Sequence, residues 1–449
     1  MKTKFLKIIL ASLVLQIISC RDFLNEKSDL KLTIPITVEA NQALLDNYNV
    51  INRDFATSGE TSADDFYLTD QEYNSLMYEE LKRLYTWQPD NVSKSVSDGN
   101  DWLYCYTGIY YANSVIYNLD TNNLQGVDAD NVRGQAYALR AARYLDAVQI
   151  WCPAYNKSTA SKDLGMPLRL DPDMNYPSLR ASVDETYKQI IVDLTKASAL
   201  LPEKPAILTR MSKPAALGLL ARTYLFMGEY ENALKSATEA LRYNNSLLDY
   251  NALDFKNNYP IKNTNTEILF SSSMSWETHL MPAKINPELY KLYQDNDLRK
   301  KVFFRTTAAG EIVFKGNYNE TGALFNSVAT DELYLIVSES FAKLGNLQES
   351  MKYLNSLLRT RYLKGTYIDK ISTTQEHALN IIQEERRKEL LLRGLRWPDI
   401  KRYNRDGANI SLKRVVNNQV FTLNFNDSRY AIAIPEDVMR ISGIPQNQR

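Results

Sequence analysis

Histidine and cysteine are scarce in this sequence of 449 residues, which contains two His and three Cys. His279 and His377 lie far apart in the chain, which argues against a histidine-based metal site or a hydrolase triad. The sequence has no Cys-x-x-Cys motif, so it carries neither a zinc nor a thioredoxin signature. Cys105 and Cys152 either pair in an oxidising compartment or remain separate buried thiols, and we expect the separate thiols.

A surplus of charge of either sign is also missing. Lys and Arg together number 53, and Asp and Glu also number 53. This balance gives no electrostatic reason to expect nucleic acid or an anionic membrane surface as a partner. The nucleophile elbow, the zinc-protease helix motif, the P-loop and the Rossmann glycine fingerprint are all absent from the sequence. A glycosidase needs only two suitably spaced carboxylates, so that class stays open, but no motif points to an enzyme.

Long apolar runs are absent except near the N-terminus. Three lysines precede an apolar stretch at residues 8–18, which is typical of a secretory signal peptide and too short to span a membrane comfortably. The stretch ends in Ile17-Ile-Ser-Cys20, which resembles a bacterial lipobox. We therefore predict a lipoprotein signal peptide at residues 1–19 and lipidation of Cys20, which would tether the protein to a membrane. The alternative is an ordinary signal peptide that is cleaved elsewhere.

Helical periodicity dominates residues 20–449, which we interpret as a single domain. A Ser-x-x-Glu capping box at Ser182 marks one helix start. The predicted parts are a tether at residues 21–40, helical units at about residues 102–151, 182–242 and 331–397, and a loop-rich insertion at about residues 243–330. The predicted fold class is mainly α, with tetratricopeptide-like helix pairs as scaffold, long irregular loop insertions and minor β structure.

An internal repeat is the clearest signal of organisation. A pattern of small, aromatic and aliphatic residues between positions 221 and 241 returns, 117 residues later, between positions 338 and 358. Each copy reads as a helix, a glycine turn and a second helix with small residues where the partner packs closely, as in a tetratricopeptide unit. The copies are not adjacent in the chain, so we do not expect a regular solenoid.

The densest charge cluster, residues 384–389, lies on a predicted helix opened by a capping box between Thr373 and Glu376. Glu385 and Glu389 interrupt the apolar face of this helix. They are either an acid–base pair or partly buried carboxylates in ion pairs. We expect ion pairs, because no nucleophile or third catalytic group is evident nearby in the sequence. The candidate partners are Arg386, Arg393, Arg396 and Arg140.

Aromatic residues in predicted loops are the candidates for ligand contact. An exposed ring with Asn and Asp nearby can stack on a sugar and bind its hydroxyl groups, and the same surface can hold a peptide. The candidate ligand-binding residues are Tyr67, Trp87, Trp276 and Tyr318. Trp102 and Trp397 fall within helical patterns and are expected in the scaffold.

Several segments, in matching order, resemble the SusD/RagB family. The lipobox continues as Cys20-Arg-Asp-Phe-Leu-Asn25, like the family's start. Residues 102–113 are similar to its Trp-x3-Tyr-x2-Ile-x3-Asn helix, and residues 136–144 to its Ala-Tyr-x-x-Arg-Ala-x-x-Tyr helix. Further similarity lies at residues 165–168, 180–194, 215–241, 385–397 and 434–437. The C-terminus departs from the family's usual ending, and the central loops match no family ligand motif, so no ligand residues are carried over.

The resemblance implies a lipoprotein of the outer membrane that faces the cell surface. It implies capture of a nutrient beside a SusC-like TonB-dependent transporter, with a glycan as the usual cargo and a peptide as the other. It implies a binding protein rather than an enzyme, and we expect no metal or cofactor. The alternative is a tetratricopeptide-type scaffold lipoprotein that binds only protein.

Overall fold

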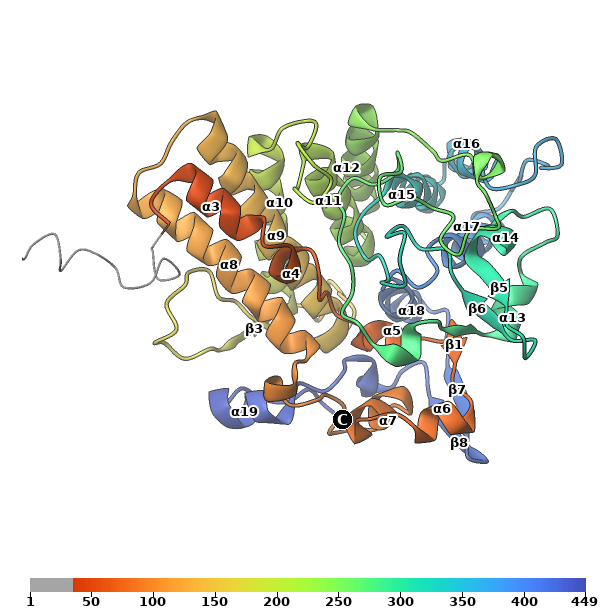
Figure 1. Cartoon of the computed structure of the whole chain (residues 1–449), viewed down its shortest axis with the longest axis horizontal. Coiled ribbons are helices and arrows are strands. Elements are labelled where there is room, and N and C mark those ends of the chain that lie inside the picture. The colour runs from red at the N-terminus through yellow and green to blue at the C-terminus, as the bar shows by residue number, and fades with distance from the viewer. Residues whose placement is uncertain (1–34) are drawn as a thin grey trace, which may run out of the picture.

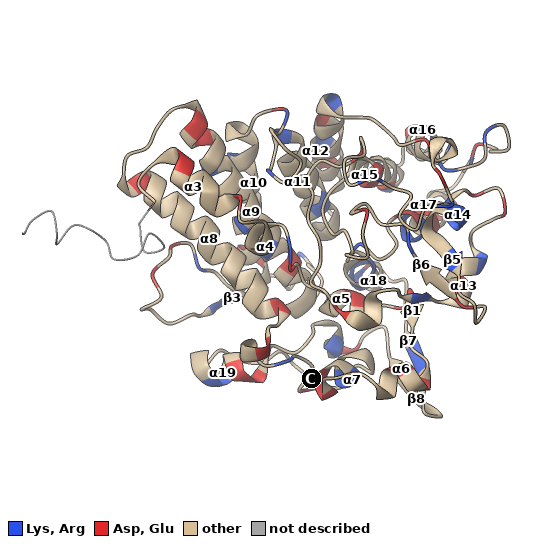
Figure 2. Cartoon of the chain, viewed as in Figure 1, with Lys and Arg blue, Asp and Glu red and all other residues tan. Residues whose placement is uncertain are grey.

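The computed structural model describes residues 35–449 as a mainly helical body with three small sheets (Figure 1). The predicted signal peptide, Cys20 and most of the predicted tether lie outside the described residues. Between residues 35 and 449, no helix is both long and apolar enough to cross a membrane. Charged residues of both signs are spread over the elements (Figure 2), in line with the balanced composition. The predicted fold class, mainly α with minor β structure, is confirmed.

A series of packed helices forms the frame of the molecule (Figure 1). Each helix packs against the next in the order α8 (Asp101–Thr121), α9 (Val127–Trp151), α10 (Val183–Leu200), α11 (Lys213–Met227), α12 (Tyr230–Tyr243), α15 (Thr330–Lys343) and α16 (Leu347–Leu358). The contacts between these helices contain many small side chains, such as the fully buried Ala141, Ala216 and Ala237, which let neighbouring helices approach closely. Two further helices, α17 (Gln375–Glu389) and α18 (Arg396–Arg405), pack against this frame.

The predicted repeat corresponds to two helix pairs, α11 with α12 and α15 with α16. Both turns contain a glycine with a positive φ, +80° at Gly228 and +85° at Gly345, a conformation that favours glycine. Ser338 and Ser350, which replace alanines of the first copy, are fully buried. Each hydroxyl donates to the other residue's carbonyl oxygen, at 2.9 and 2.8 Å, so neither polar group is left unsatisfied. The pairs are distant in sequence, yet α12 packs directly on α15.

The chain leaves this stack between α12 and α15 and builds a second core around a four-stranded sheet. The strands are antiparallel in the order β1 (Phe66–Tyr67), β4 (Lys284–Ile285), β6 (Ile312–Phe314) and β5 (Phe304–Thr306). Aromatic side chains fill this core, and Phe66, Tyr293 and Phe303 are each at most 2% exposed. The segment predicted as loop-rich is therefore a packed layer with its own core, which we call the insertion layer (residues 244–329).

Short elements connect and cover the frame and the insertion layer. The short α-helices are α3 (Val38–Leu45), α4 (Tyr48–Ile51), α5 (Ser58–Ser62), α6 (Asp70–Asn74), α7 (Glu79–Tyr85), α13 (Pro287–Lys291), α14 (Arg299–Phe303) and α19 (Glu436–Ser442). Two further antiparallel sheets each contain two strands, β2 (Leu164–Pro167) with β3 (Arg180–Ser182) and β7 (Leu412–Val416) with β8 (Gln419–Leu423).

Two predicted helix starts can be compared with the structure. Ser182 caps α10 and forms the predicted capping box with Glu185. At α17 the predicted cap is wrong by one residue, because the side chain of Thr374 accepts the backbone N–H of His377. The thiols of Cys105 and Cys152 are buried and free, so the predicted separate thiols are confirmed.

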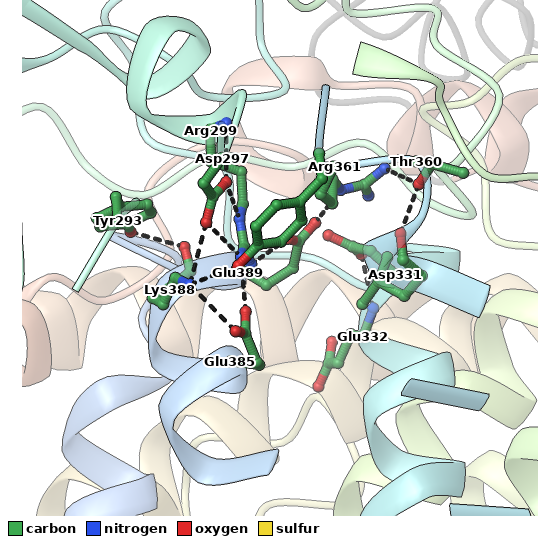
Figure 3. A network of polar contacts seen from close by, with 12 residues as sticks. Tyr293, Asp297, Arg299, Asp331, Glu332, Thr360, Arg361, Glu385, Lys388 and Glu389 are labelled. Carbon is green, nitrogen blue, oxygen red and sulfur yellow. Dashed lines mark hydrogen bonds and ion pairs between the residues drawn. The ribbon is translucent and has the colours of Figure 1, made fainter. Parts of the chain in front are cut away.

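A buried network of charges joins the insertion layer to the frame (Figure 3). Glu385 pairs with Arg299 at 2.6 Å, and Glu389 pairs with Arg299 at 3.0 Å and with Arg361 at 2.6 Å. Arg361 pairs in turn with Glu267 at 2.7 Å. All five side chains are at most 2% exposed. Arg299 and Glu267 belong to the insertion layer, whereas Glu385 and Glu389 lie on α17 and Arg361 lies in the turn after α16. These pairs therefore hold the insertion layer against the helices.

The prediction that Glu385 and Glu389 are ion-paired is confirmed, but the predicted partners are wrong. The four candidate arginines pair elsewhere: Arg386 with Asp399, Arg393 with Asp331, Arg396 with Asp64 and Arg140 with Asp193. Burial raises the pKa of Glu385, but the charges of Arg299 and Lys388 outweigh it and leave the pKa below its usual value. Glu385 is therefore a structural carboxylate that stays ionised, not a proton donor.

Candidate ligand-binding site

The indole of Trp276 lines a hollow in the insertion layer with a volume of about 140 Å³. Trp276 is 56% exposed, and Tyr259, which also lines the hollow, is 37% exposed. The polar side chains at the hollow are those of Asn258, Arg305, Lys315 and Asn317. Buried apolar side chains complete the lining, among them Leu280, Phe314 and Leu324. The hollow thus combines exposed rings, polar groups and an apolar lining.

The two exposed rings meet at Gly322. A Cβ atom on Gly322 would lie 3.3 Å from Cη2 of Trp276 and 3.5 Å from the hydroxyl oxygen of Tyr259. The glycine therefore leaves room for the edge of the indole and for the hydroxyl of Tyr259 at the same point of the lining. Two neighbouring exposed rings form an aromatic surface of the kind that stacks on the apolar face of a sugar.

Several polar groups at the hollow are available to a ligand. The amide of Asn258, the indole N–H of Trp276 and the guanidinium of Arg305 form no hydrogen bond or ion pair with any residue between 35 and 449. Lys315 differs, because its ammonium donates to the carbonyl oxygens of Phe255 at 2.7 Å and Asn257 at 3.1 Å. Unused donors beside an aromatic surface are the groups that orient a polar ligand in a pocket.

The backbone that presents Trp276 is anchored by its neighbours. Glu277 pairs with Lys94 at 2.8 Å. Nε2 of His279 lies 2.8 Å from the hydroxyl oxygen of Thr61. Burial lowers the pKa of His279 to about 4, so its ring is neutral near pH 7 and serves as a hydrogen-bonding anchor. A ring held on a fixed backbone can bind a ligand without first becoming ordered.

Two of the predicted ligand-binding aromatics are not exposed. Trp87 is 4% exposed, and its indole N–H donates to the carbonyl oxygen of Ser62 at 2.9 Å. Tyr318 is 2% exposed, and its hydroxyl lies between the carboxylates of Glu267 and Asp331, 3.0 Å from the latter. Each ring packs in the core because its polar group has a buried partner. In this structure the side chains of Trp87 and Tyr318 are both buried and do not form part of a ligand-accessible surface.

The other predicted aromatics lie in different places. Tyr67 is half-buried in β1, where it pairs with Lys284, and it does not line the hollow. Trp276 lies at the hollow, and ligand contact there remains a prediction. Trp102 and Trp397, expected in the scaffold, are buried in α8 and α18.

Sequence reasoning missed Tyr259, Asn258 and Arg305. A signal for the first two was present, because Asn257-Asn-Tyr-Pro260 combines turn-forming residues with a ring. Arg305 carried no signal, since an arginine in a short polar stretch reads as ordinary solvated surface. Only the fold brings these residues together with Trp276.

A second and larger pocket, of about 540 Å³, lies between α8, residues 169–178 and α19. Tyr110 and Tyr176 line it and are 42% and 38% exposed. The guanidinium of Arg169 lies 3.8 Å from the ring centre of Tyr176 and donates to the carbonyl oxygen of Tyr176. The amide of Asn113 donates to two backbone carbonyl oxygens. The side chains of Arg169 and Asn113 are therefore already bonded within the protein.

Within the described part of the chain, no Asp or Glu lines the Trp276 hollow. Glycoside hydrolysis needs two carboxylates across the bound sugar, and the hollow does not present that arrangement. Within residues 35–449, no group of three or more His, Cys, Asp or Glu side chains is placed to hold a metal ion. The residues that line the hollow can therefore bind a ligand by aromatic stacking, by hydrogen bonding and by positive charge.

Comparison with known protein families places this geometry in context. One family model, described as "Starch-binding associating with outer membrane", matches residues 22–225, and a second, described as "SusD family", matches residues 331–447. Together they cover more than half of the chain. The chain belongs to the SusD/RagB family. SusD/RagB proteins are non-catalytic sugar-binding proteins associated with the outer membrane, so the predictions of a binding protein and of outer-membrane association are confirmed at the level of the family.

Individual SusD-like proteins agree with this assignment. SusD-like protein P38 of Formosa agariphila is 23% identical to this chain over 351 residues. The aligned region covers 61% of this chain and 66% of that protein, which is slightly less than two thirds of its length. A putative sugar binding protein from Bacteroides vulgatus superposes with a TM-score of 0.73 at 21% identity, covering 92% of this chain and 99% of that chain. A laminarin-binding SusD-like protein gives a TM-score of 0.66 at 17% identity, covering 91% and 98%. The SusD-like fold is therefore confirmed.

Proposed function

We propose that this chain captures a glycan at the Trp276 hollow and delivers it to a SusC-like TonB-dependent transporter of the outer membrane. The observation that carries the proposal is the exposed ring of Trp276 beside Tyr259, with the unbonded amide of Asn258 at the same hollow. The rings would stack on a sugar, and the amide and indole N–H would bind its hydroxyl groups. A peptide is the other cargo that such a surface could hold.

Substitution of Trp276 tests the site. Trp276→Ala is expected to weaken glycan binding by roughly 10- to 100-fold, because loss of an aromatic stacking contact typically costs about 1–3 kcal/mol. The measurement is isothermal titration calorimetry with neutral and acidic oligosaccharides and with peptides. Tyr117→Ala is the matched control, since Tyr117 is 54% exposed on α8 and does not line the hollow. Unchanged binding by Trp276→Ala, or an equal loss in the control, would reject this site.

Lipid attachment at Cys20 is the proposed anchor. It is supported by the lipobox-like sequence Ile17-Ile-Ser-Cys20 and by the outer-membrane association of the family. Cys20→Ala is expected to give a folded protein that no longer sediments with outer membranes. Membrane retention of the variant would overturn the lipid anchor.

The proposed handover requires a transporter partner and weak binding. A ligand that must pass on cannot be held tightly, so we expect dissociation constants of roughly micromolar or weaker. The tagged mature protein should recover one large TonB-dependent barrel from detergent-solubilised outer membranes. Recovery of only periplasmic proteins would favour a scaffold role.

A protein-interaction scaffold is the second candidate function. The larger pocket lined by Tyr110 and Tyr176, which we call the Tyr110 pocket, favours this function. Met174 and Ile441, which also line that pocket, are each 76% exposed. Exposed apolar side chains gathered at a pocket are typical of protein interfaces. Under this alternative, Tyr110→Ala would abolish the recovery of partner proteins, and Trp276→Ala would have no effect on any ligand.

A further inference from the structure

The Trp276 hollow is locally cationic in a chain without net charge. Arg305 and Lys315 line it, and no Asp or Glu of the described residues does, although the whole chain has 53 basic and 53 acidic residues. Arg305 lies on β5 and Lys315 directly follows β6, the neighbouring strand of the sheet, whereas the Lys and Arg of α14 do not line the hollow. The excess of positive charge is therefore a property of this hollow and not of the chain's overall composition.

Arg305 has no partner among the described residues. It is an exposed residue of β5, which is the edge strand of the sheet. Its guanidinium forms no ion pair or hydrogen bond with any residue from 35 to 449, so five N–H donors are available. A guanidinium matches the oxygen pairs of a carboxylate or a sulfate with two parallel hydrogen bonds.

Lys315 adds a second positive charge, which forms no ion pair with a carboxylate of residues 35–449. It is 7% exposed, and its ammonium donates to two backbone carbonyl oxygens, which leaves one of its three N–H donors. Burial lowers the pKa of Lys315, and the nearby charge of Arg305 lowers it further, against the opposing charge of Asp254. Two cations that repel each other in this way are stabilised when an anion binds between them.

Three acidic residues near the hollow are already paired, and a fourth, Asp254, forms no ion pair with a described residue. Glu277 pairs with Lys94, and Glu320 pairs with Lys262. Across the sheet, Glu311 pairs with Lys284 at 2.6 Å. Asp254 influences Lys315 but forms no ion pair with it. Among residues 35–449, therefore, no carboxylate forms an ion pair with Arg305.

We infer that the glycan bound at the Trp276 hollow is anionic, bearing a uronate carboxylate or a sulfate ester that Arg305 binds while the sugar ring stacks on Trp276. This inference rests on the proposed glycan-binding function and names the class of glycan. Arg305 is the residue that selects for charge, and Trp276 is the residue that provides affinity for any sugar.

Calorimetry with three matched oligosaccharides tests the inference: an oligogalacturonate, a sulfated galactan fragment and a neutral galactan fragment of equal length. The wild-type protein should bind at least one anionic ligand roughly 10-fold or more tightly than the neutral one, since a charge-assisted hydrogen bond is stronger than a neutral one. Comparing the two anionic ligands distinguishes carboxylate from sulfate. The preference should shrink as salt is raised from low to high concentration, because the guanidinium is exposed to screening.

Two variants separate this inference from the proposed function. Arg305→Gln should bring the ratio of anionic to neutral affinity close to one, whereas Trp276→Ala should weaken both ligands together. Arg440→Gln is the control, because Arg440 is an exposed residue of α19 without an ion pair in the described chain and does not line the hollow. It should leave the ratio unchanged. Equal wild-type affinity for all three ligands, or a ratio unaffected by Arg305→Gln, overturns the anionic class alone. Binding that survives Trp276→Ala overturns the site itself.

Discussion

Two arginines of the insertion layer have opposite surroundings. Arg299 is fully buried and pairs with Asp297, Glu385 and Glu389 at 2.6 to 3.0 Å. Arg305, six positions later, is exposed at the Trp276 hollow and pairs with no described residue. A buried charge needs partners to offset its desolvation, whereas an exposed guanidinium is satisfied by water that a ligand can displace. The difference separates the charges that hold the fold from those that can bind a ligand.

Removing a carboxylate from the buried network should have the largest effect. Glu385→Gln removes the charge that pairs with Arg299 at 2.6 Å and with Lys388 at 3.1 Å. Breaking a buried ion pair from one side typically costs about 3–5 kcal/mol. The free energy of unfolding, measured with urea, should fall by that amount, while the folded fraction binds glycan as the wild type does. Intact stability with lost affinity would show that Glu385 acts at the ligand.

Glu60 is a buried carboxylate that forms no ion pair within residues 35–449, and its titration gives a pH-dependent contrast to the paired Glu385. Glu60 accepts a hydrogen bond from the backbone N–H of Gly394 at 2.8 Å, and burial, followed by the negative charge of Asp65, raises its pKa to about 8. Between about pH 4.5 and 8 the folded state holds a proton that the unfolded state has lost, so ionisation destabilises the fold as the pH rises.

Glu60→Gln keeps the shape and removes this titration. Relative to the variant, the wild type should lose stability on the order of a few kcal/mol between pH 5 and 8. Urea unfolding at each pH measures the difference. Asp146, whose pKa burial raises to about 7, contributes equally to both proteins and cancels. A difference that does not vary with pH would mean that Glu60 is ionised throughout.

Removing the hydroxyl of Tyr318 in the core and that of Tyr259 at the hollow should have different effects on the free energy of unfolding. Tyr318→Phe removes a buried hydroxyl from between Glu267 and Asp331, which should cost about 1–3 kcal/mol because the carboxylate that accepts its single proton loses that donor. Tyr259→Phe removes an exposed hydroxyl at the hollow and should leave the unfolding free energy within about 0.5 kcal/mol of wild type. Thermal and urea unfolding distinguish the two. A destabilised Tyr259→Phe beside an unaffected Tyr318→Phe would reverse the assignment of core and surface.

Features that depend on neighbouring residues could be predicted from the sequence, whereas contacts between distant residues could not. Helices and the repeat were predictable because their signals are local, as at Gly228 and Gly345. Ion pairing of Glu385 was predictable because a carboxylate on an apolar helix face needs a partner. The identity of Arg299 as that partner was not, since the two residues are 86 positions apart in the chain.

The candidate site was predictable only in part for a related reason. Trp87, Trp276 and Tyr318 all lie in segments that read as loops, but two of them pack in the core and one remains exposed. Position in a loop does not determine burial when the loop belongs to a packed layer. The unused donors of Arg305 could be recognised only from the fold, because being unpaired depends on every neighbouring segment.

The smallest effect on stability is expected at Arg305. Arg305→Gln breaks no ion pair or hydrogen bond with a described residue, so the unfolding free energy should stay within about 0.5 kcal/mol of wild type, in contrast to Glu385→Gln. Urea unfolding of both variants in one buffer measures the contrast. A loss above about 1 kcal/mol would give Arg305 a structural role and remove the distinction between the two arginines. If stability is unchanged while the preference for anionic glycans disappears, the charge of Arg305 is needed for the ligand and not for the fold.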